Sequence, residues 1–256
     1  MNRLSRAHSF NTAAARYAAN RPSYPPALFD AVEEFTGRPL AGARVADVGA
    51  GTGIATVLLR ERGAEVIAVE PGDGMAAQFR SALPDVPVVR GDGNALPLAD
   101  ASCDLITYAQ SWHWTDTARS VPEALRVLRP DGALAVWWNT PAFDVPWISA
   151  QHARIAQCSG VNTPAEVLPD DSRAVQLAGL AGLHVARRHL RWSRTVPLDT
   201  HLANIGSHSG FLVLGEPGTR AFLADERARL REIFPDERVE ETYVVDLLVA
   251  TRAGTT

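Results

Sequence analysis

The chain has 256 residues, a formal net charge of −4 and 46% hydrophobic residues, which suits one α/β domain, or one such domain that carries a sizeable insertion. No block of like charge occurs, so the composition argues against nucleic acid or an anionic membrane as a partner. All 25 basic residues are arginine, which excludes lysine chemistry, and the two cysteines lack metal-ligand spacing, so we expect no metal.

The first elements alternate between helical and strand patterns. PALFDAVEEF begins with Pro26, and Gly37 ends this helix, in the asymmetric pattern expected of helix ends. ARVADVG is a buried strand, after which we expect Thr52 to cap a helix in GIATVLLRERG that ends at Gly63. AEVIAVE is the second strand, and a helix through Met75 and Phe79 follows it. VPVVR and CDLITYA are the third and fourth strands.

A helix over TARSVPEALRVL, a turn at RPDG and a fifth strand, ALAVWW, complete this series. The alternation stops after Asn139. Residues 140–181 contain helical patterns, LHVARRHLRWSRTVPL is β-rich, helical patterns continue through Arg231, and TYVVDLLVATR is the last strand. Strands that are apolar on both faces and alternate with helices indicate a mostly parallel sheet covered on both sides.

The stretch VADVGAGTG ends the first strand with Gly49, Gly51 and Gly53 at alternate positions. Glycines this dense indicate a backbone that turns tightly or approaches a ligand. The carboxyl end of the first strand is also where open parallel sheets bind ligands. A dinucleotide fingerprint requires G-x-G-x-x-G, but Ile54 stands where its third glycine belongs, which argues against a nicotinamide-dependent oxidoreductase.

Two carboxylates favour a different nucleotide-like ligand. Asp47, two residues before the loop, would repel a pyrophosphate but suits a cationic amine or sulfonium. Glu70 ends the second strand, where it can accept hydrogen bonds from both hydroxyls of a ribose. Ribose without pyrophosphate, beside a positive charge, describes S-adenosylmethionine.

Four stretches in order resemble the motifs of class I S-adenosylmethionine-dependent methyltransferases over roughly residues 40–139: VADVGAGTG, VIAVEP, GDGNALPLADASCDLITYAQSWHW and EALRVLRPDGALAVWW. YAANRPSYP, together with SWHWTD, resembles the small-molecule group that includes trans-aconitate methyltransferase. Two features depart from the pattern: Gly93–Asn94 stands where relatives commonly have Ala–Glu, and PDG where PGG is usual. The resemblance implies a Rossmann-like, doubly wound, mostly parallel seven-stranded sheet with an antiparallel last strand and helical lid insertions.

The resemblance also implies which residues bind S-adenosyl-L-methionine and its product S-adenosyl-L-homocysteine. The glycine loop would lie against the methionine part, the Glu70 carboxylate would take the ribose, and the Asp92 carboxylate would accept from the adenine amino group. An N-terminal arm would close over the cofactor. The implied cofactor-binding residues are Tyr17, Arg21, Asp47, Gly49, Ala50, Gly51, Gly53, Glu70, Pro71, Met75, Asp92, Gly93, Asn94, Ala109 and Gln110.

Methyl transfer is an in-line displacement from an activated sulfonium, so the protein chiefly aligns the acceptor and excludes water. A base is needed only if the acceptor must lose a proton. His113, at the mouth of the fourth strand, is the candidate base, although a lone histidine is more often structural.

Aromatic and histidine side chains mark two further regions. Four tryptophans cluster near the ends of strands four and five: Trp112, Trp114, Trp137 and Trp138. We expect at least two of them to pack in the core, and the alternative is that they line an aromatic acceptor pocket. His201 and His208 are candidates for lining an acceptor site.

We therefore expect a single methyltransferase domain over residues 1–256 that methylates a small organic molecule, with oxygen favoured over carbon or nitrogen. The alternative is a protein that binds S-adenosylmethionine without transferring methyl, such as a cyclase or a regulator. The expected parts are an arm and helix (1–36), a cofactor-binding core (40–139), lid or acceptor insertions (140–181 and 197–236) and last strands (182–196 and 240–252). No signal peptide or membrane span is apparent, so we expect a cytoplasmic monomer or homodimer without nucleic acid or membrane partners.

Overall fold

The computed structural model describes residues 21–159, 179–207 and 209–252. The chain divides into two compact units, and three strands contribute residues to both. Unit 1 comprises Met1–Pro22, Thr140–Leu168 and Arg191–Val244. Unit 2 comprises Ser23–Asn139, Pro169–Leu190 and Val245–Thr256.

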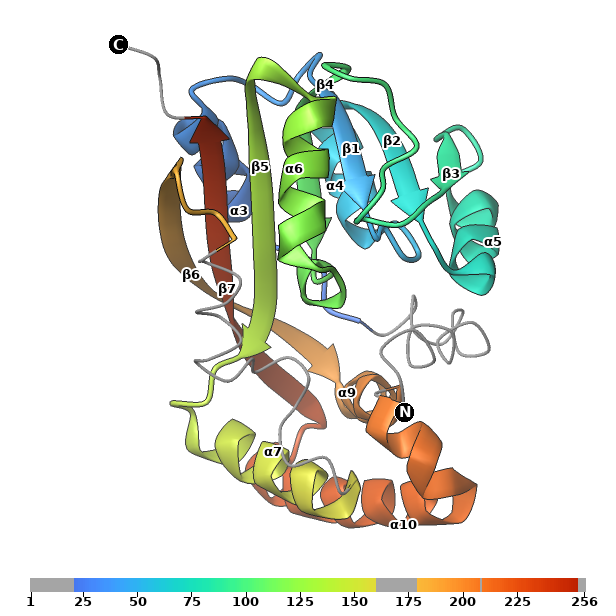
Figure 1. Ribbon diagram of the computed structural model, residues 1–256. Helices are drawn as coiled ribbons and strands as arrows, with labels where there is room; N and C mark the ends of the chain where they lie inside the picture. The colour runs from blue at the N-terminus through green and yellow to red at the C-terminus, as the bar shows by residue number, and fades with distance from the viewer. Residues whose placement is uncertain (1–20, 160–178, 208, 253–256) are drawn as a thin grey trace. The chain divides into compact units, whose positions relative to one another are not determined.

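Unit 2 is built on a seven-stranded sheet in the order β3-β2-β1-β4-β5-β7-β6 (Figure 1). The strands are β1 (Arg44–Val48), β2 (Glu65–Glu70), β3 (Val88–Arg90), β4 (Cys103–Ala109), β5 (Leu128–Pro141), β6 (Leu183–Pro197) and β7 (Arg238–Arg252). Strands β1 to β5 pair in parallel, whereas β7 runs in the opposite direction to β5. The predicted Rossmann-like, mostly parallel sheet with an antiparallel last strand is confirmed.

Helices cover both faces of this sheet, and α6 lies on the opposite face from α4 (Figure 1). The helices of unit 2 are α3 (Pro26–Thr36), α4 (Ile54–Glu61), α5 (Asp73–Ala82) and α6 (Thr117–Val127), with a short 3-10 helix η2 at Trp112–Trp114. Burial on both sides explains why strand residues such as Ala46, Ala68 and Ile106 are fully buried. The predicted helix start at Pro26 and its left-handed cap at Gly37 are also confirmed.

Two local predictions are wrong. Thr52 does not cap α4, because Gly53 occupies the N-cap position in a left-handed conformation and no side chain caps the helix. The RPDG stretch is not a free turn but lies within β5, where Cys103 pairs with Leu128 and Leu105 with Ala133, so that the intervening residues bulge. Arg252 stabilises the bulge by donating from Nη1 to the carbonyls of residues 129 and 130, at 2.7 and 3.0 Å.

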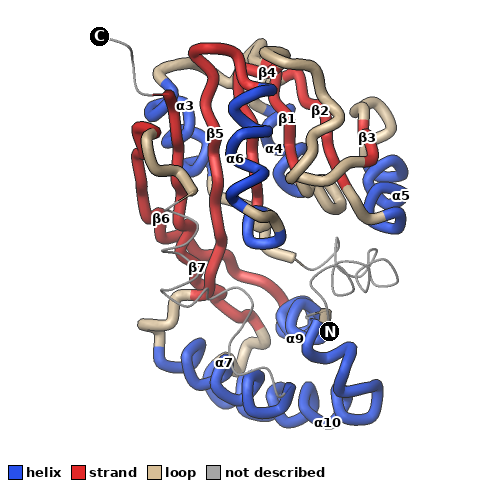
Figure 2. Tube along the Cα trace, viewed as in Figure 1, coloured by secondary structure: helices blue, strands red, loops and turns tan. Residues whose placement is uncertain are grey.

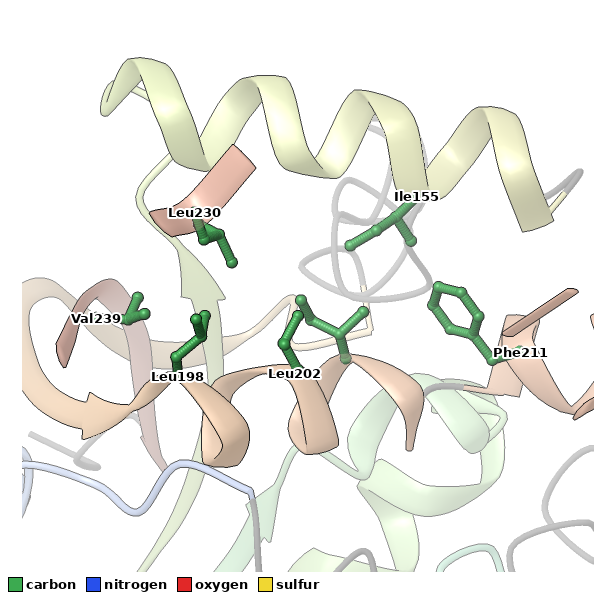
Figure 3. Packing of buried hydrophobic residues seen from close by; sticks show 7 residues of the cluster. Ile155, Leu198, Leu202, Phe211, Leu230 and Val239 are labelled. Carbon is green, nitrogen blue, oxygen red and sulfur yellow. The ribbon is translucent and has the colours of Figure 1, made fainter. Parts of the chain in front are cut away.

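Unit 1 consists mainly of helices over its described residues (Figure 2), which confirms the helical patterns expected there, while residues 160–178 of the expected stretch 140–181 lie outside the described residues. They are α7 (Pro146–Ser159), α9 (Leu198–Gly206) and α10 (Ser209–Ile233), the last kinked at Gly215. Seven buried side chains from these helices and β7 form its apolar core (Figure 3): Ile155, Leu198, Leu202, Ile205, Phe211, Leu230 and Val239. None of the helices in the described residues is both long and apolar enough to cross a bilayer.

Leu202 tests how much this core stabilises unit 1. Its side chain is 3% exposed at the centre of the cluster in Figure 3. We expect Leu202→Ala to lower the free energy of unfolding by about 2–5 kcal/mol, through lost burial and the cavity left behind. Urea denaturation measures the change, with Ile233→Ala as the control because Ile233 is 48% exposed. Equal losses in the two variants would contradict this account of the core.

Candidate functional site

The glycine loop between β1 and α4 adopts a conformation that suits glycine at all three positions. Gly49, Gly51 and Gly53 have φ values of +68°, +60° and +94°. A Cβ on Gly49 would lie 2.5 Å from the Cβ of Ser111, and one on Gly53 would lie 2.6 Å from Leu83 Cδ1. A Cβ on Gly51 would meet nothing within 4 Å. Packing therefore requires glycine at two positions, whereas the backbone of Gly51 lies beside open space.

Asp47 lies beneath this loop and is fully buried. Its Oδ2 accepts from the Thr56 hydroxyl at 2.6 Å, and its Oδ1 accepts from the Thr107 hydroxyl at 2.9 Å. Burial raises the pKa of the Asp47 carboxyl, and the two hydroxyl donors offset this only in part. Asp47 thus ties β1 to α4 and β4, and its predicted place near a ligand amine stays a prediction.

Glu70, at the carboxyl end of β2, joins two loops. Its Oε2 accepts from the Gly51 N–H at 2.8 Å, and its Oε1 accepts from the Gly72 N–H at 2.7 Å. Glu70 is 6% exposed, and burial raises the pKa of its carboxyl despite these two N–H donors. Each carboxylate oxygen can still accept a second hydrogen bond, so two adjacent hydroxyl groups could be bound there.

The segment after β3 is held by its own polar groups. Oδ1 of the exposed Asp92 accepts from the backbone and side-chain N–H groups of Asn94 at 2.8 and 2.9 Å. Asn94 Oδ1 accepts from the Asp116 N–H at 2.8 Å, and the Tyr108 hydroxyl donates to the Gly93 carbonyl at 3.1 Å. A Cβ on Gly93 would lie 3.1 Å from the Tyr108 ring. These contacts fix the conformation of the Gly93–Asn94 segment.

Pro71 and Met75, expected beside the adenine, lie in different environments. Pro71 is exposed and its carbonyl accepts from Arg90, whereas Met75 is 7% exposed on α5.

The carboxyl end of β4 holds a strained residue that sequence reasoning did not single out as such. Gln110 has a φ of +57°, which costs a non-glycine residue on the order of 1 kcal/mol. Its backbone N–H donates to the Trp137 carbonyl and its Nε2 to the Asn139 carbonyl, both at 3.0 Å. The next residue, Ser111, donates from Oγ to the Val48 carbonyl at 2.5 Å and abuts the glycine loop. Ser111 is therefore packed against the glycine loop, whereas Gln110 is tied to β5.

His113 lies in η2, half-buried, with its ring centroid 4.8 Å from that of Trp114. Trp112, Trp137 and Trp138 are at most 2% exposed, which confirms core packing for at least two of the four tryptophans. No signal in the sequence separated these three from Trp114, which is only half-buried.

The remaining candidates belong to unit 1. His201 is 5% exposed and contacts Glu241 and Gln151. The Arg21 carbonyl accepts from Arg194 Nη1 at 3.4 Å. Tyr17 and His208 lie outside the described residues.

Comparisons with known proteins agree on the kind of domain. Residues 46–136 match the family described as methyltransferase domain. An uncharacterised methyltransferase of Mycobacterium tuberculosis is 44% identical over 140 residues, which cover 55% of this chain and 56% of the relative, so the match spans about half of each protein.

Two solved structures share the fold over almost the whole chain. A candidate type II methyltransferase of Anaeromyxobacter dehalogenans has a TM-score of 0.65 at 24% identity and covers 91% of this chain and 97% of its own. The [4+2]-cyclase SpnF has a TM-score of 0.57 at 17% identity, and the match covers 99% of this chain and 98% of the cyclase. Residues 46–136 are therefore similar to a methyltransferase domain, and the solved structures share the Rossmann-like fold described above.

Proposed function

We propose that the chain is an S-adenosylmethionine-dependent methyltransferase that acts on a small organic acceptor. The observation that carries the proposal is the pair of buried carboxylates, Asp47 and Glu70, around the glycine loop. Burial raises the pKa of both carboxyls, so each ionised form gains from a nearby positive charge. A cationic ligand would stabilise both ionised carboxylates, whereas the negative pyrophosphate of a dinucleotide would repel them.

The residues around the loop fit the parts of such a cofactor. Glu70 has oxygens available for the two ribose hydroxyls. The Thr52 hydroxyl is buried and has no hydrogen-bond partner among the described residues, and it lies just before the N-terminus of α4. A hydroxyl donor and a helix N-terminus both suit a carboxylate, such as that of the methionine part. When bound, the cofactor supplies a methyl group activated by the sulfonium.

The outer contacts of the cofactor site are proposed from the resemblance. Asp92, Gly93 and Asn94 would meet the adenine, and Ala109 and Gln110 would face the sulfonium side. Arg21 and Tyr17 would cover the cofactor. The hydrogen bonds of Gln110 to the carbonyls of Trp137 and Asn139 hold its backbone and its side chain respectively, which supports a rigid wall at the end of β4.

The acceptor is proposed from the sequence alone. We favour methylation at oxygen and a relationship to the trans-aconitate methyltransferase group, from the YAANRPSYP and SWHWTD stretches. The cytoplasmic location and the monomer or homodimer state stay predictions.

A second candidate is a protein that binds the cofactor without transferring methyl. It is favoured by the fold shared with the [4+2]-cyclase SpnF over almost the whole of both chains. Formation of S-adenosylhomocysteine in the presence of acceptor mixtures separates the two candidates, because only a transferase produces it.

Calorimetric titration tests the cofactor assignment. We expect S-adenosylmethionine and S-adenosylhomocysteine to bind and reduced nicotinamide dinucleotide not to bind, because the carboxylates around the loop select against pyrophosphate. Tighter binding of the nicotinamide cofactor than of S-adenosylmethionine would overturn the assignment.

The raised pKa of Glu70 makes cofactor affinity depend on pH. The ionised carboxylate accepts from the ribose hydroxyls, so the protein must release a proton on binding at a pH below the raised value. We expect the Kd for S-adenosylhomocysteine to increase, by up to about tenfold per pH unit, as the pH falls through that value, which lies above 4.5. Glu70→Gln is the control, since it cannot titrate. An equal pH dependence in both proteins would assign the titration to another group, such as Asp47.

His113 is proposed as the base for an acceptor that must lose a proton. We expect His113→Ala to lower turnover about 10²–10⁴-fold while the Kd for S-adenosylhomocysteine is unchanged, because a base acts only on the acceptor. Single-turnover formation of S-adenosylhomocysteine measures the effect. If His113→Ala keeps its turnover, His113 is not the base and its role is structural.

A further inference from the structure

Gln110 is unusual among the residues that have a positive φ. Three non-glycine residues in the described part of the chain have one: Ala101 at +48°, Gln110 at +57° and Glu237 at +54°. Ala101 and Glu237 are exposed residues between elements, whereas Gln110 is half-buried at the carboxyl end of β4. Strain at such a position persists only where the surrounding contacts enforce it, and strained residues are concentrated at ligand-binding sites.

The hydrogen bonds of Gln110 determine which atom of its amide a ligand can meet. Its Nε2 donates to the Asn139 carbonyl at 3.0 Å. Because a carbonyl can only accept, the amide nitrogen must be the atom that faces Asn139. Oε1 is the other end of the amide, and no hydrogen bond to it occurs within the described residues. Gln110 therefore holds a hydrogen-bond acceptor in a fixed orientation that is available to a ligand.

Gln110 and Glu70 lie on opposite sides of the glycine loop. The neighbouring strands are in the order β2-β1-β4, and the loop follows the middle one. Glu70 ends β2 and contacts the loop at Gly51, while Ser111, the residue after Gln110, abuts Gly49 from the side of β4. A nucleoside bound by its ribose at Glu70 and crossing the loop therefore directs the group on its sugar toward β4. In S-adenosylmethionine that group is the sulfonium.

We propose that Gln110 Oε1 binds the sulfonium of S-adenosylmethionine and thereby distinguishes this cofactor from its uncharged product, an inference that rests on the proposed function. The negative end of the amide dipole attracts the positive sulfur and the methyl C–H groups that the sulfur polarises. S-adenosylhomocysteine has a neutral sulfur and lacks the methyl group, so it gains much less from Oε1. Gln110 therefore favours binding of the cofactor over retention of the product.

Asp47 carries a full negative charge but is not placed for this contact. It is fully buried beneath the loop, and its two oxygens accept from the hydroxyls of Thr56 and Thr107. Its attraction acts through the loop on any positive charge above it. A contact that separates a sulfonium from a thioether needs an acceptor atom that the ligand can touch, and the half-buried Gln110 supplies one.

Calorimetric titration of Gln110→Gly tests this assignment, because glycine adopts a positive φ without strain and the variant should fold. We expect the Kd for S-adenosylmethionine to rise about three- to tenfold, and the Kd for S-adenosylhomocysteine to change by less than about twofold. The matched control is Ala101→Gly, which also relieves a positive φ in unit 2 but lies before β4, and it should leave both Kd values unchanged. An equal change in both Kd values for Gln110→Gly, or no change in either, would overturn the inference.

The same titration separates a failure of this inference from a failure of the proposed function. If the unmodified protein binds neither S-adenosylmethionine nor S-adenosylhomocysteine, the cofactor assignment fails and Gln110 has no sulfonium to bind. If the unmodified protein binds both and Gln110→Gly weakens both equally, the cofactor assignment stands and the role of Gln110 is wrong.

NMR on the unmodified protein gives a readout that needs no variant. With S-adenosylmethionine carrying ¹³C at its methyl group, we expect nuclear Overhauser effects between the methyl protons and the side chain of Gln110 in the saturated complex. The Gln110 signals are assigned through the backbone. If the methyl protons show such effects to other residues and none to Gln110, the proposal is wrong.

Discussion

The burial of two carboxylates at the carboxyl ends of β1 and β2 is the constraint on which the site depends. Asp47 and Glu70 have almost no contact with water, so every lone pair they direct into the protein needs a donor. Asp47 takes its donors from Thr56 and Thr107, and Glu70 takes its donors from two backbone N–H groups. These requirements set the path of the glycine loop, because the Gly51 N–H must point toward Glu70 while the backbone passes above Asp47.

Buried carboxylates have different kinds of partner in the two units. In unit 2, Asp47 and Glu70 receive neutral donors, and burial raises the pKa of both carboxyls. In unit 1, Glu226 and Glu241 contact arginine, and Glu241 has a lowered pKa. Arg90 only partly offsets the effect of burial on the pKa of Glu70, so a cationic ligand would stabilise the ionised forms of both Asp47 and Glu70. Glu226 and Glu241 already have arginine partners. This contrast supports the proposal that a cationic ligand binds at the glycine loop.

The strained Gln110 and the bulge in β5 show how tertiary contacts outweigh local preference. RPDG is a strong turn signal on its own, and it becomes part of β5 because Leu128 already pairs with Cys103 and Arg252 binds the carbonyls of the bulge. Gln110 keeps an unfavourable φ because its backbone and side chain are both tied to β5. Thr52 is a good capping residue in isolation, but the left-handed Gly53 takes the N-cap position of α4. The Thr52 hydroxyl therefore does not cap the helix.

The sequence by itself determined the order of strands and helices, the mostly parallel sheet and the place of the glycine loop, because hydrophobic periodicity and glycine spacing are local signals. It also identified Asp47 and Glu70 as carboxylates at strand ends. Only the tertiary structure decided which partners those carboxylates have, that Tyr108 and Thr115 pack closely against Gly93, and that His201 lies buried between Glu241 and Gln151. Such pairings join residues up to 60 positions apart for Asp47 and 50 for His201. The reason is that hydrogen-bond partners across a fold depend on strand register and helix packing, which no local pattern encodes.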